Sequence, residues 1–173
     1  VHCAAPSSRR GYHRLAKVPA LVDAGVNLTL GTDNMSENMF DAMRIGIVVN
    51  RGMRGDGYNP TPIEVLSWTT VNGARALERD DLGTLCAGKK ADLSVIRLDR
   101  PHLTPLLDLT SSLVHYAQDS DVESVMVDGE WVMRDGQVLT MDEDEVIQDA
   151  QQASMEAWRS LRQTWPGLSV PVD

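Results

Sequence analysis

Several kinds of protein are excluded by what this sequence has little of. Only two of its 173 residues are cysteines, Cys3 and Cys86, and they form no C-x-x-C pattern. This usage fits a protein of the reducing cytoplasm better than a fold held together by disulfides. No apolar run approaches the roughly 20 residues that a membrane helix needs. Basic residues are in deficit, and the net charge of −9 argues against a nucleic-acid partner. We expect a soluble, cytoplasmic protein with neither a membrane nor a nucleic-acid partner.

The start of the chain lacks two further features. It opens on Val1-His2-Cys3, without an initiator methionine and without the charged and then apolar layout of a signal peptide. Processing, or the choice of the expressed segment, would also remove a methionine. We nevertheless expect the chain to be a piece of something longer.

Familiar catalytic motifs are missing as well. The four histidines show neither H-x-H nor H-E-x-x-H spacing, so no self-sufficient zinc site is predicted. Ser7 and Ser8 lack the G-x-S-x-G elbow of serine hydrolases, and the P-C-x-x-C of zinc nucleobase deaminases is absent. His102 and His115 fall in the later part of the chain and are interpreted as structural or surface histidines.

The most informative stretch that is present runs from Val26 to Asp33. It is typical of a short apolar strand, it follows a helix stop at Gly25, and a helical pattern resumes around Met39 to Val49. In α/β folds the carboxyl ends of the strands meet at the crevice where chemistry occurs. Asp33 is therefore either a ligand at that crevice, or a helix cap or Asx turn. His2, at the end of a first strand, would face the same crevice or belong to the core.

The pattern of elements changes near residue 80. Before it, a strand end at 1–3, a helix at 18–24, the strand at 26–33 and a helix at 40–50 follow the β-α-β-α rhythm of a parallel sheet. A capping box, Thr61 with Glu64, starts another helix, and 70–77 is helical too.

After residue 80 the sequence favours an antiparallel meander. Strands are expected at 92–98, 122–127, 130–134 and 137–140, with one or two helical turns at 110–117. Asp128-Gly129 and Asp135-Gly136 are hairpin dipeptides that take positive φ. A final helix is expected from Met141 to Arg162, with Thr140 and Glu143 as its capping box.

Motifs in a fixed order along most of the chain resemble one known family. They are Val1-His2-Cys3 with Pro6-Ser7-Ser8, Val18 to Asp33, Asp41-Ala42-Met43-Arg44, Thr70 to Leu77, Gly83-Thr84-Leu85, Gly88 to Leu93, and Val125 to Gly129. Together they resemble the C-terminal part of the amidohydrolase superfamily, in the branch with cytosine-deaminase-like, adenosine-analogue-deaminase-like and triazine-hydrolase-like members. The chain departs from the family's motifs at two places, Ala4-Ala5 before Pro6 and Asn34-Met35-Ser36-Glu37 after the strand. In the family both places contact the substrate, so the identity of the substrate stays open.

The resemblance implies an α/β plus β architecture. Residues 1–80 would be the last two βα units of a (β/α)₈ TIM-type barrel, carrying strands seven and eight. Residues 81–140 would be the C-terminal part of a small β-sandwich, and 141–173 a terminal helix and tail. Such barrels hold one or two divalent metals, zinc here with iron as the alternative. Of the family's metal ligands only the strand-eight aspartate, Asp33, lies in this chain.

The resemblance also implies a function. The whole protein would be a metal-dependent hydrolase of carbon–nitrogen bonds other than peptide bonds, acting on a small, heterocyclic substrate and forming a homo-oligomer. Asp33 would bind the metal and accept the proton of the attacking water, Thr32 would orient the turn, and His2 and Ser8 would bind substrate. The competing hypothesis is a catalytically inert fragment, or a scaffold that pairs with other subunits.

Overall fold

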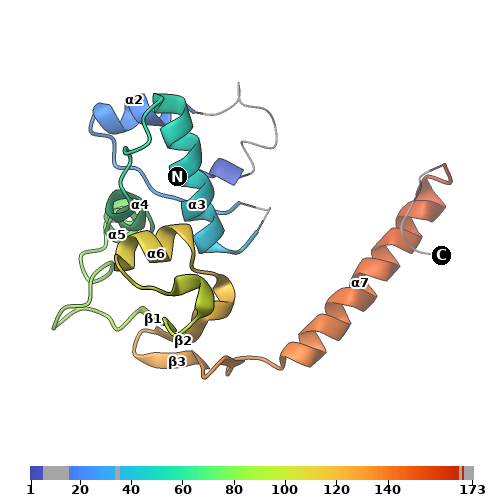
Figure 1. Cartoon of the computed structure of the whole chain (residues 1–173). Helices are drawn as coiled ribbons and strands as arrows, with labels where there is room; N and C mark the ends of the chain where they lie inside the picture. Colours follow the sequence, from blue (N-terminus) through green and yellow to red (C-terminus); the bar gives the residue numbers. More distant parts are fainter. Residues whose placement is uncertain (6–15, 34–35, 168, 170–173) are drawn as a thin grey trace.

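The computed structural model describes residues 1–5, 16–33, 36–167 and 169 (Figure 1). The first half of the chain is helical, and the second half holds a small sheet followed by one long helix. The helices are α2 (Val18–Asp23), α3 (Met39–Arg54), α4 (Pro62–Thr69), α5 (Val71–Ala76), α6 (Leu109–His115) and α7 (Glu143–Thr164). The strands are β1 (Leu93–Ile96), β2 (Val122–Val127), β3 (Glu130–Arg134) and β4 (Gln137–Val138), with single 3₁₀ turns at Pro101–Leu103 and Asp119–Asp121.

The ends of α3 and α4 follow from local side-chain chemistry. The Asn38 side chain accepts hydrogen bonds from the Phe40 and Asp41 N–H groups in the first turn of α3, and Gly55 ends that helix in the left-handed conformation. The expected capping box of α4 is confirmed, because Thr61 and Glu64 satisfy each other's backbone N–H groups.

The strand expected at 26–33 is shorter than its sequence indicates. The structure has a single parallel bridge there, between His2 and Leu30. The segment is otherwise extended without forming a regular ladder, because helices rather than a second strand bind its other edge, as described below. A β-branched apolar run identifies an extended segment but says nothing of what lies beside it.

The sheet is the expected antiparallel meander, in the order β1-β2-β3-β4. Its two tight hairpins are confirmed: Asp128 and Gly129 have φ of 51° and 85°, and Asp135 and Gly136 have φ of 51° and 79°. Two consecutive positive φ values give the turn whose twist matches the flanking strands. The chain is therefore a mixed α/β structure with a four-stranded antiparallel sheet.

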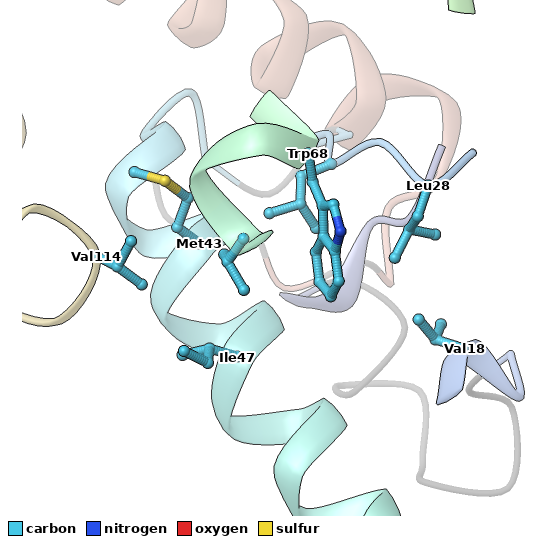
Figure 2. Close-up of a cluster of buried hydrophobic side chains, with 8 residues drawn as sticks. Val18, Leu28, Met43, Ile47, Trp68 and Val114 are labelled. Atoms are coloured by element: carbon cyan, nitrogen blue, oxygen red, sulfur yellow. The ribbon is translucent and has the colours of Figure 1, made fainter. Parts of the chain in front are cut away.

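The hydrophobic core joins the extended segment to the helices (Figure 2). Its buried members are Val18, Leu28, Leu30, Met43, Ile47, Val65, Trp68 and Val114. Helix α3 lies directly against the extended segment at Gly46, where an added Cβ would come within 3.3 Å of Leu30. The core thus holds the segment that precedes Asp33 against α3.

Helix α7 extends away from the rest of the chain (Figure 1), and none of its residues is buried. The expected capping box at its start is wrong. The helix begins at Glu143, and Asp142 is its N-cap, with its carboxylate accepting from the Glu145 N–H. Asp142 is favoured over Thr140 as the N-cap because its charged carboxylate complements the positive start of the helix better than a hydroxyl does. Within the part of the chain that the structure describes, no helix combines the length and the apolar character needed to cross a bilayer.

Candidate functional site

The site predicted from the sequence is built on two extended segments that lie side by side. The N–H of His2 donates to the Thr29 carbonyl at 2.7 Å, and the N–H of Gly31 donates to the His2 carbonyl at 3.1 Å. These two bonds form the parallel bridge. The ends of the two segments, the second of which leads directly into Asp33, therefore lie at the same edge.

Gly31 is the residue that allows this close approach. A Cβ at this position would lie 2.8 Å from Val1 Cγ1 and 3.3 Å from Cys3 Sγ. Side chains alternate across an extended chain. Val1, Cys3 and Gly31 therefore share one face of the paired segments, and His2 and Leu30 share the other. The glycine of the Gly-Thr-Asp sequence thus serves packing between the segments.

The other edge of the segment is held by α4 and α5. The N–H of Leu30 donates to the Trp68 carbonyl at 3.3 Å, and the Asn72 carboxamide donates to the Leu28 carbonyl at 2.8 Å. Asn27 returns a hydrogen bond from its own carboxamide to the Asn72 carbonyl at 3.0 Å. In the sequence Asn72 stands out only as part of the motif from Thr70 to Leu77, and side-chain spacing gives no signal for this hydrogen-bonding role.

Asn72→Ala is expected to destabilise the chain by about 1–3 kcal/mol, because it leaves the buried Leu28 carbonyl without its donor. The measurement is urea unfolding of the 173-residue chain. Gln151→Ala, on an exposed helix position, is the control and should change the free energy of unfolding by less than about 0.5 kcal/mol. Equal effects of the two substitutions would show that Asn72 does not hold the segment.

Asp33 lies just past the end of the paired segment, with an exposed side chain. Its φ of 57° is in the left-handed region, which aspartate and asparagine enter more readily than other non-glycine residues. The alternative that Asp33 caps the next helix is wrong, because the N-cap of α3 is Asn38. The role of Asp33 as a metal ligand stays a prediction.

His2 is buried, with only 5% of its surface exposed, and its Nε2 has no hydrogen-bond partner among the described residues. Its position beside Leu30 places it on the face that carries the core residue. Its role in substrate binding stays a prediction. Ser8, the other predicted substrate-binding residue, lies outside the described residues, as do Asn34 and Met35 of the departing loop.

The buried position of His2 predicts a pH dependence. Burial lowers the pKa of His2 from its usual value, and the positive Val1 amino group acts in the same direction. As the pH falls through about 6.5, the unfolded chain therefore binds a proton before the folded chain does. The stability that neutral His2 contributes is present above that pH and is lost below it.

We therefore expect the free energy of unfolding to fall as the pH is lowered below about 6.5, with a His2 share of at most about 1.4 kcal/mol per pH unit. Urea unfolding of the wild type and of His2→Gln across this range measures that share. His115 has a lowered pKa too and keeps its own contribution in the variant. Identical pH slopes for the two proteins would contradict this account of His2.

The two later histidines occupy structural positions. The His102 Nε2 lies 2.8 Å from the Asp121 Oδ2, and Asp121 is only 1% exposed. The backbone carbonyl of His115 accepts from the Arg44 Nε at 2.9 Å, and burial lowers the pKa of the His115 ring. Both histidines line an open hollow of about 520 Å³ between α3 and α6.

The residues present do not by themselves make a metal centre. In the described ranges, no group of three or more His, Cys, Asp or Glu side chains lies close enough together to hold a metal ion. A zinc site needs three or four protein ligands. Asp33 can supply at most one of them, so any metal would need ligands from outside this part of the molecule.

This geometry agrees with comparisons to known proteins. The sequence model of the Amidohydrolase family matches residues 1–132. The chain belongs to the amidohydrolase family. The resemblance drawn from the motifs is thereby confirmed, including the relation to deaminases, which hydrolyse C–N bonds.

Relatives of the chain in this family are named as deaminases. The 5-methylthioadenosine/S-adenosylhomocysteine deaminase of Caldanaerobacter subterraneus is 40% identical over 121 residues, which are 66% of this chain and 28% of that protein. The 5'-deoxyadenosine deaminase of Methanosarcina acetivorans is 40% identical over 123 residues, 67% of this chain and 28% of that protein. The chain therefore spans little more than a quarter of the length of these curated relatives.

Solved structures of the family share the fold. An adenosine deaminase from Xanthomonas campestris with bound zinc aligns with a TM-score of 0.78 and 28% identity, over 87% of this chain and 34% of that one. An atrazine chlorohydrolase from Arthrobacter aurescens, complexed with zinc, aligns with a TM-score of 0.70 and 23% identity, over 80% of this chain and 32% of that one. The second likeness shows the fold alone.

Proposed function

We propose that this chain is the C-terminal part of a metal-dependent hydrolase that deaminates a small aminated heterocycle, with an adenosine-type nucleoside as the favoured substrate. The observation that carries the proposal is Asp33, placed just past a segment that pairs in parallel with residues 1–3, in a chain of the amidohydrolase family. The names of the relatives favour adenosine derivatives. The whole protein's activity is part of the proposal.

The proposal includes an architecture for the whole protein. Residues 1–80 are the last two βα units of a (β/α)₈ barrel, 81–140 are part of a β-sandwich, and 141–173 are a terminal helix and tail. The parallel pairing of His2 with Leu30 supports the first unit, since barrel strands are parallel. The antiparallel order of β1 to β4 supports the second.

In this proposal, each residue of the site has a stated task. Asp33 supplies one metal ligand, and His2 and Ser8 line the substrate crevice. Gly31 and Asn72 fix the backbone that leads to Asp33, through the close contact with Cys3 and the hydrogen bond to Leu28. The metal is zinc, with iron as the alternative. Bound in a complete site, it would supply the acidity that makes water a nucleophile near neutral pH.

A second candidate is that the 173-residue chain is inert by itself and acts as a scaffold. The observation that favours it is the lack of any three-residue metal group among residues 1–5, 16–33, 36–167 and 169. The two candidates are compatible if the chain is a part of an enzyme. They compete only if the chain is a complete protein.

The test compares the 173-residue chain with the full-length protein that contains it. Each is incubated with adenosine, 5-methylthioadenosine and S-adenosylhomocysteine, and released ammonia is measured. We expect the full-length protein to release ammonia, to lose this activity on chelation and to regain it with zinc. The 173-residue chain alone is expected to release no ammonia, with or without added zinc. Ammonia release that survives complete metal removal would contradict the metal-dependent proposal. Stoichiometric, tight zinc binding by the chain alone would contradict the assignment of the other ligands to the rest of the protein.

A further inference from the structure

Only one asparagine of this chain is followed by glycine, and the pair lies in α5. The six asparagines precede, in chain order, leucine, methionine, methionine, arginine, proline and, at Asn72, glycine. Asparagine is thermolabile because the backbone nitrogen of the next residue can attack its side-chain amide carbon. Glycine in that next position has no Cβ to hinder the attack, and its backbone reaches the required geometry easily. Deamidation is therefore favoured at Asn72-Gly73 over the other asparagines.

Deamidation at this pair needs no cofactor, only water. The Gly73 backbone nitrogen forms a bond to the Asn72 Cγ, and the bond from Cγ to Nδ2 breaks. The proton of the attacking nitrogen ends on the leaving group, which departs as ammonia. Water then opens the resulting succinimide ring at either of its carbonyls and leaves an aspartyl or isoaspartyl residue. The net reaction consumes one water, releases one ammonia and exchanges NH2 for OH.

The folded chain protects Asn72 from this reaction. Its Nδ2 donates to the Leu28 carbonyl at 2.8 Å, and the helical backbone of α5 holds the Gly73 nitrogen away from the side chain that it must attack. Ring closure therefore requires α5 to open, so the rate of deamidation depends on how often that opening occurs.

Helix α5 is poorly secured against such opening. It has six residues, and helices this short are not stable without packing. Its N-cap, Thr70, makes no side-chain capping hydrogen bond, and Ala74 is its one buried residue. Gly73 adds to the weakness, because glycine in a helix costs stability relative to alanine. No described residue lies within 4 Å of the place where a Gly73 Cβ would stand, apart from its own helix, so packing does not require this glycine.

Asn50 provides an internal comparison. Its Nδ2 also donates to a backbone carbonyl at 2.8 Å, that of Gly46. Two features separate it from Asn72. Arg51 follows it in the chain, and it lies inside the 16-residue helix α3 with 2% of its surface exposed. The same kind of hydrogen bond is therefore secure at Asn50, whereas Asn72 is exposed to attack whenever α5 opens.

Deamidation removes the hydrogen bond that holds the extended segment. An aspartyl carboxylate offers only acceptors, so it faces the Leu28 carbonyl oxygen without a proton between them. A negative charge in the first turn of α5 gains from the helix dipole. This gain is the smaller effect, because the carbonyl of the buried Leu28 loses its donor. The product therefore does not close again as the asparagine form does.

We propose that Asn72-Gly73 is a deamidation site, and that reaction there permanently releases from α5 the extended segment that leads to Asp33. The release is permanent because the ammonia is lost to solvent. The proposal is independent of the proposed catalytic function, since it involves neither metal nor substrate. Deamidation of this pair also yields at most one ammonia per chain, whereas catalysis releases many.

The first test follows the mass of the 173-residue chain during incubation in mildly alkaline buffer below its melting temperature, with peptide mapping to locate the change. We expect the mass gain of one NH2-to-OH exchange in the peptide that contains Asn72, and none at Asn50. Gly73→Ala should slow the gain by about fivefold or more, because alanine makes the opening of α5 about fivefold rarer and also hinders ring closure. Circular dichroism checks that this variant keeps its helix content.

The second test examines the product by urea unfolding. Asn72→Asp, which supplies the deamidated side chain in a uniform sample, should unfold at a lower urea concentration than the wild type at neutral pH. This deficit should narrow as the pH falls toward about 4, because the protonated carboxyl group again donates to the Leu28 carbonyl. Asn72→Ala has no such group, so its deficit relative to the wild type should not narrow.

Three results would overturn the proposal. The first is a mass gain that appears at another asparagine before it appears at Asn72. The second is a Gly73→Ala variant that deamidates as fast as the wild type. The third is an Asn72→Asp variant with the wild-type unfolding midpoint at neutral pH, which would show that the reaction releases nothing. The same mass and unfolding measurements apply to the full-length protein, so they decide this proposal whether or not that protein deaminates a nucleoside.

Discussion

In the full-length protein, Asp33→Asn is expected to lower kcat by about 10²–10⁴-fold, the range for loss of a positioned acid or base. The carboxamide keeps the size of the side chain, but it removes the negative charge and the site that accepts a proton. The fold should survive, because Asp33 is exposed and asparagine tolerates its left-handed φ of 57° as well as aspartate does. Steady-state deamination rates and a thermal melt of the purified variant provide the two readings.

Asp135→Asn is the matched control for this substitution. Asp135 is also exposed, also has a left-handed φ, of 51°, and lies in the hairpin between β3 and β4. We expect it to leave both kcat and the melting temperature unchanged. If Asp33→Asn retained near wild-type turnover while Asp135→Asn behaved the same way, Asp33 would have no part in the chemistry.

Asp121→Ala is expected to destabilise the chain by about 3–5 kcal/mol, the usual cost of removing one partner from a buried charge cluster. The Asp121 carboxylate is 1% exposed, lies 2.8 Å from the His102 Nε2 and accepts from the Gln118 N–H at 2.9 Å. Its Oδ1 also lies 3.6 Å from the Arg100 Nε. Alanine leaves these groups buried or half-buried without their anion. Urea unfolding measures the loss.

Asp119→Ala, two residues away in the same 3₁₀ turn, is the control for Asp121. Asp119 is exposed, so this change should cost less than about 1 kcal/mol. Burial opposes ionisation of Asp121, but hydrogen bonds from His102 and Gln118 outweigh it and lower its pKa. The Asp121 contribution should therefore persist above about pH 4 and be lost as the pH falls further. Equal costs for the two substitutions would show that the buried cluster does not anchor this part of the chain.

Local features of the fold were predictable because neighbouring residues determine them. The capping box of Thr61 and Glu64 involves two residues three positions apart, and each Asp-Gly hairpin needs only two residues that accept positive φ. The pairing of β2 with β3 and of β3 with β4 follows from those hairpins. The family could be recognised because its motifs are spread along the chain in a fixed order.

Contacts between distant segments were not predictable in this way. Asn72 donates to Leu28, 44 residues earlier in the chain, and His102 meets Asp121, 19 residues later. The strand at 26–33 was overestimated because its other edge is bound by helices. Which of several polar residues caps a helix also depended on geometry, as Asn38 and Asp142 show. The catalytic assignment of Asp33 rests on ligands that the described residues do not contain.

The most direct test of the central proposal is the DNA sequence upstream of the Val1 codon. We expect the reading frame to continue through several hundred bases and to encode an H-x-H motif followed by further histidines at predicted strand ends, because a (β/α)₈ barrel needs about 200 residues or more and this chain supplies only its end. A start codon at Val1, preceded in frame by a stop, would contradict the proposal that the chain is the C-terminal part of a metal-dependent hydrolase.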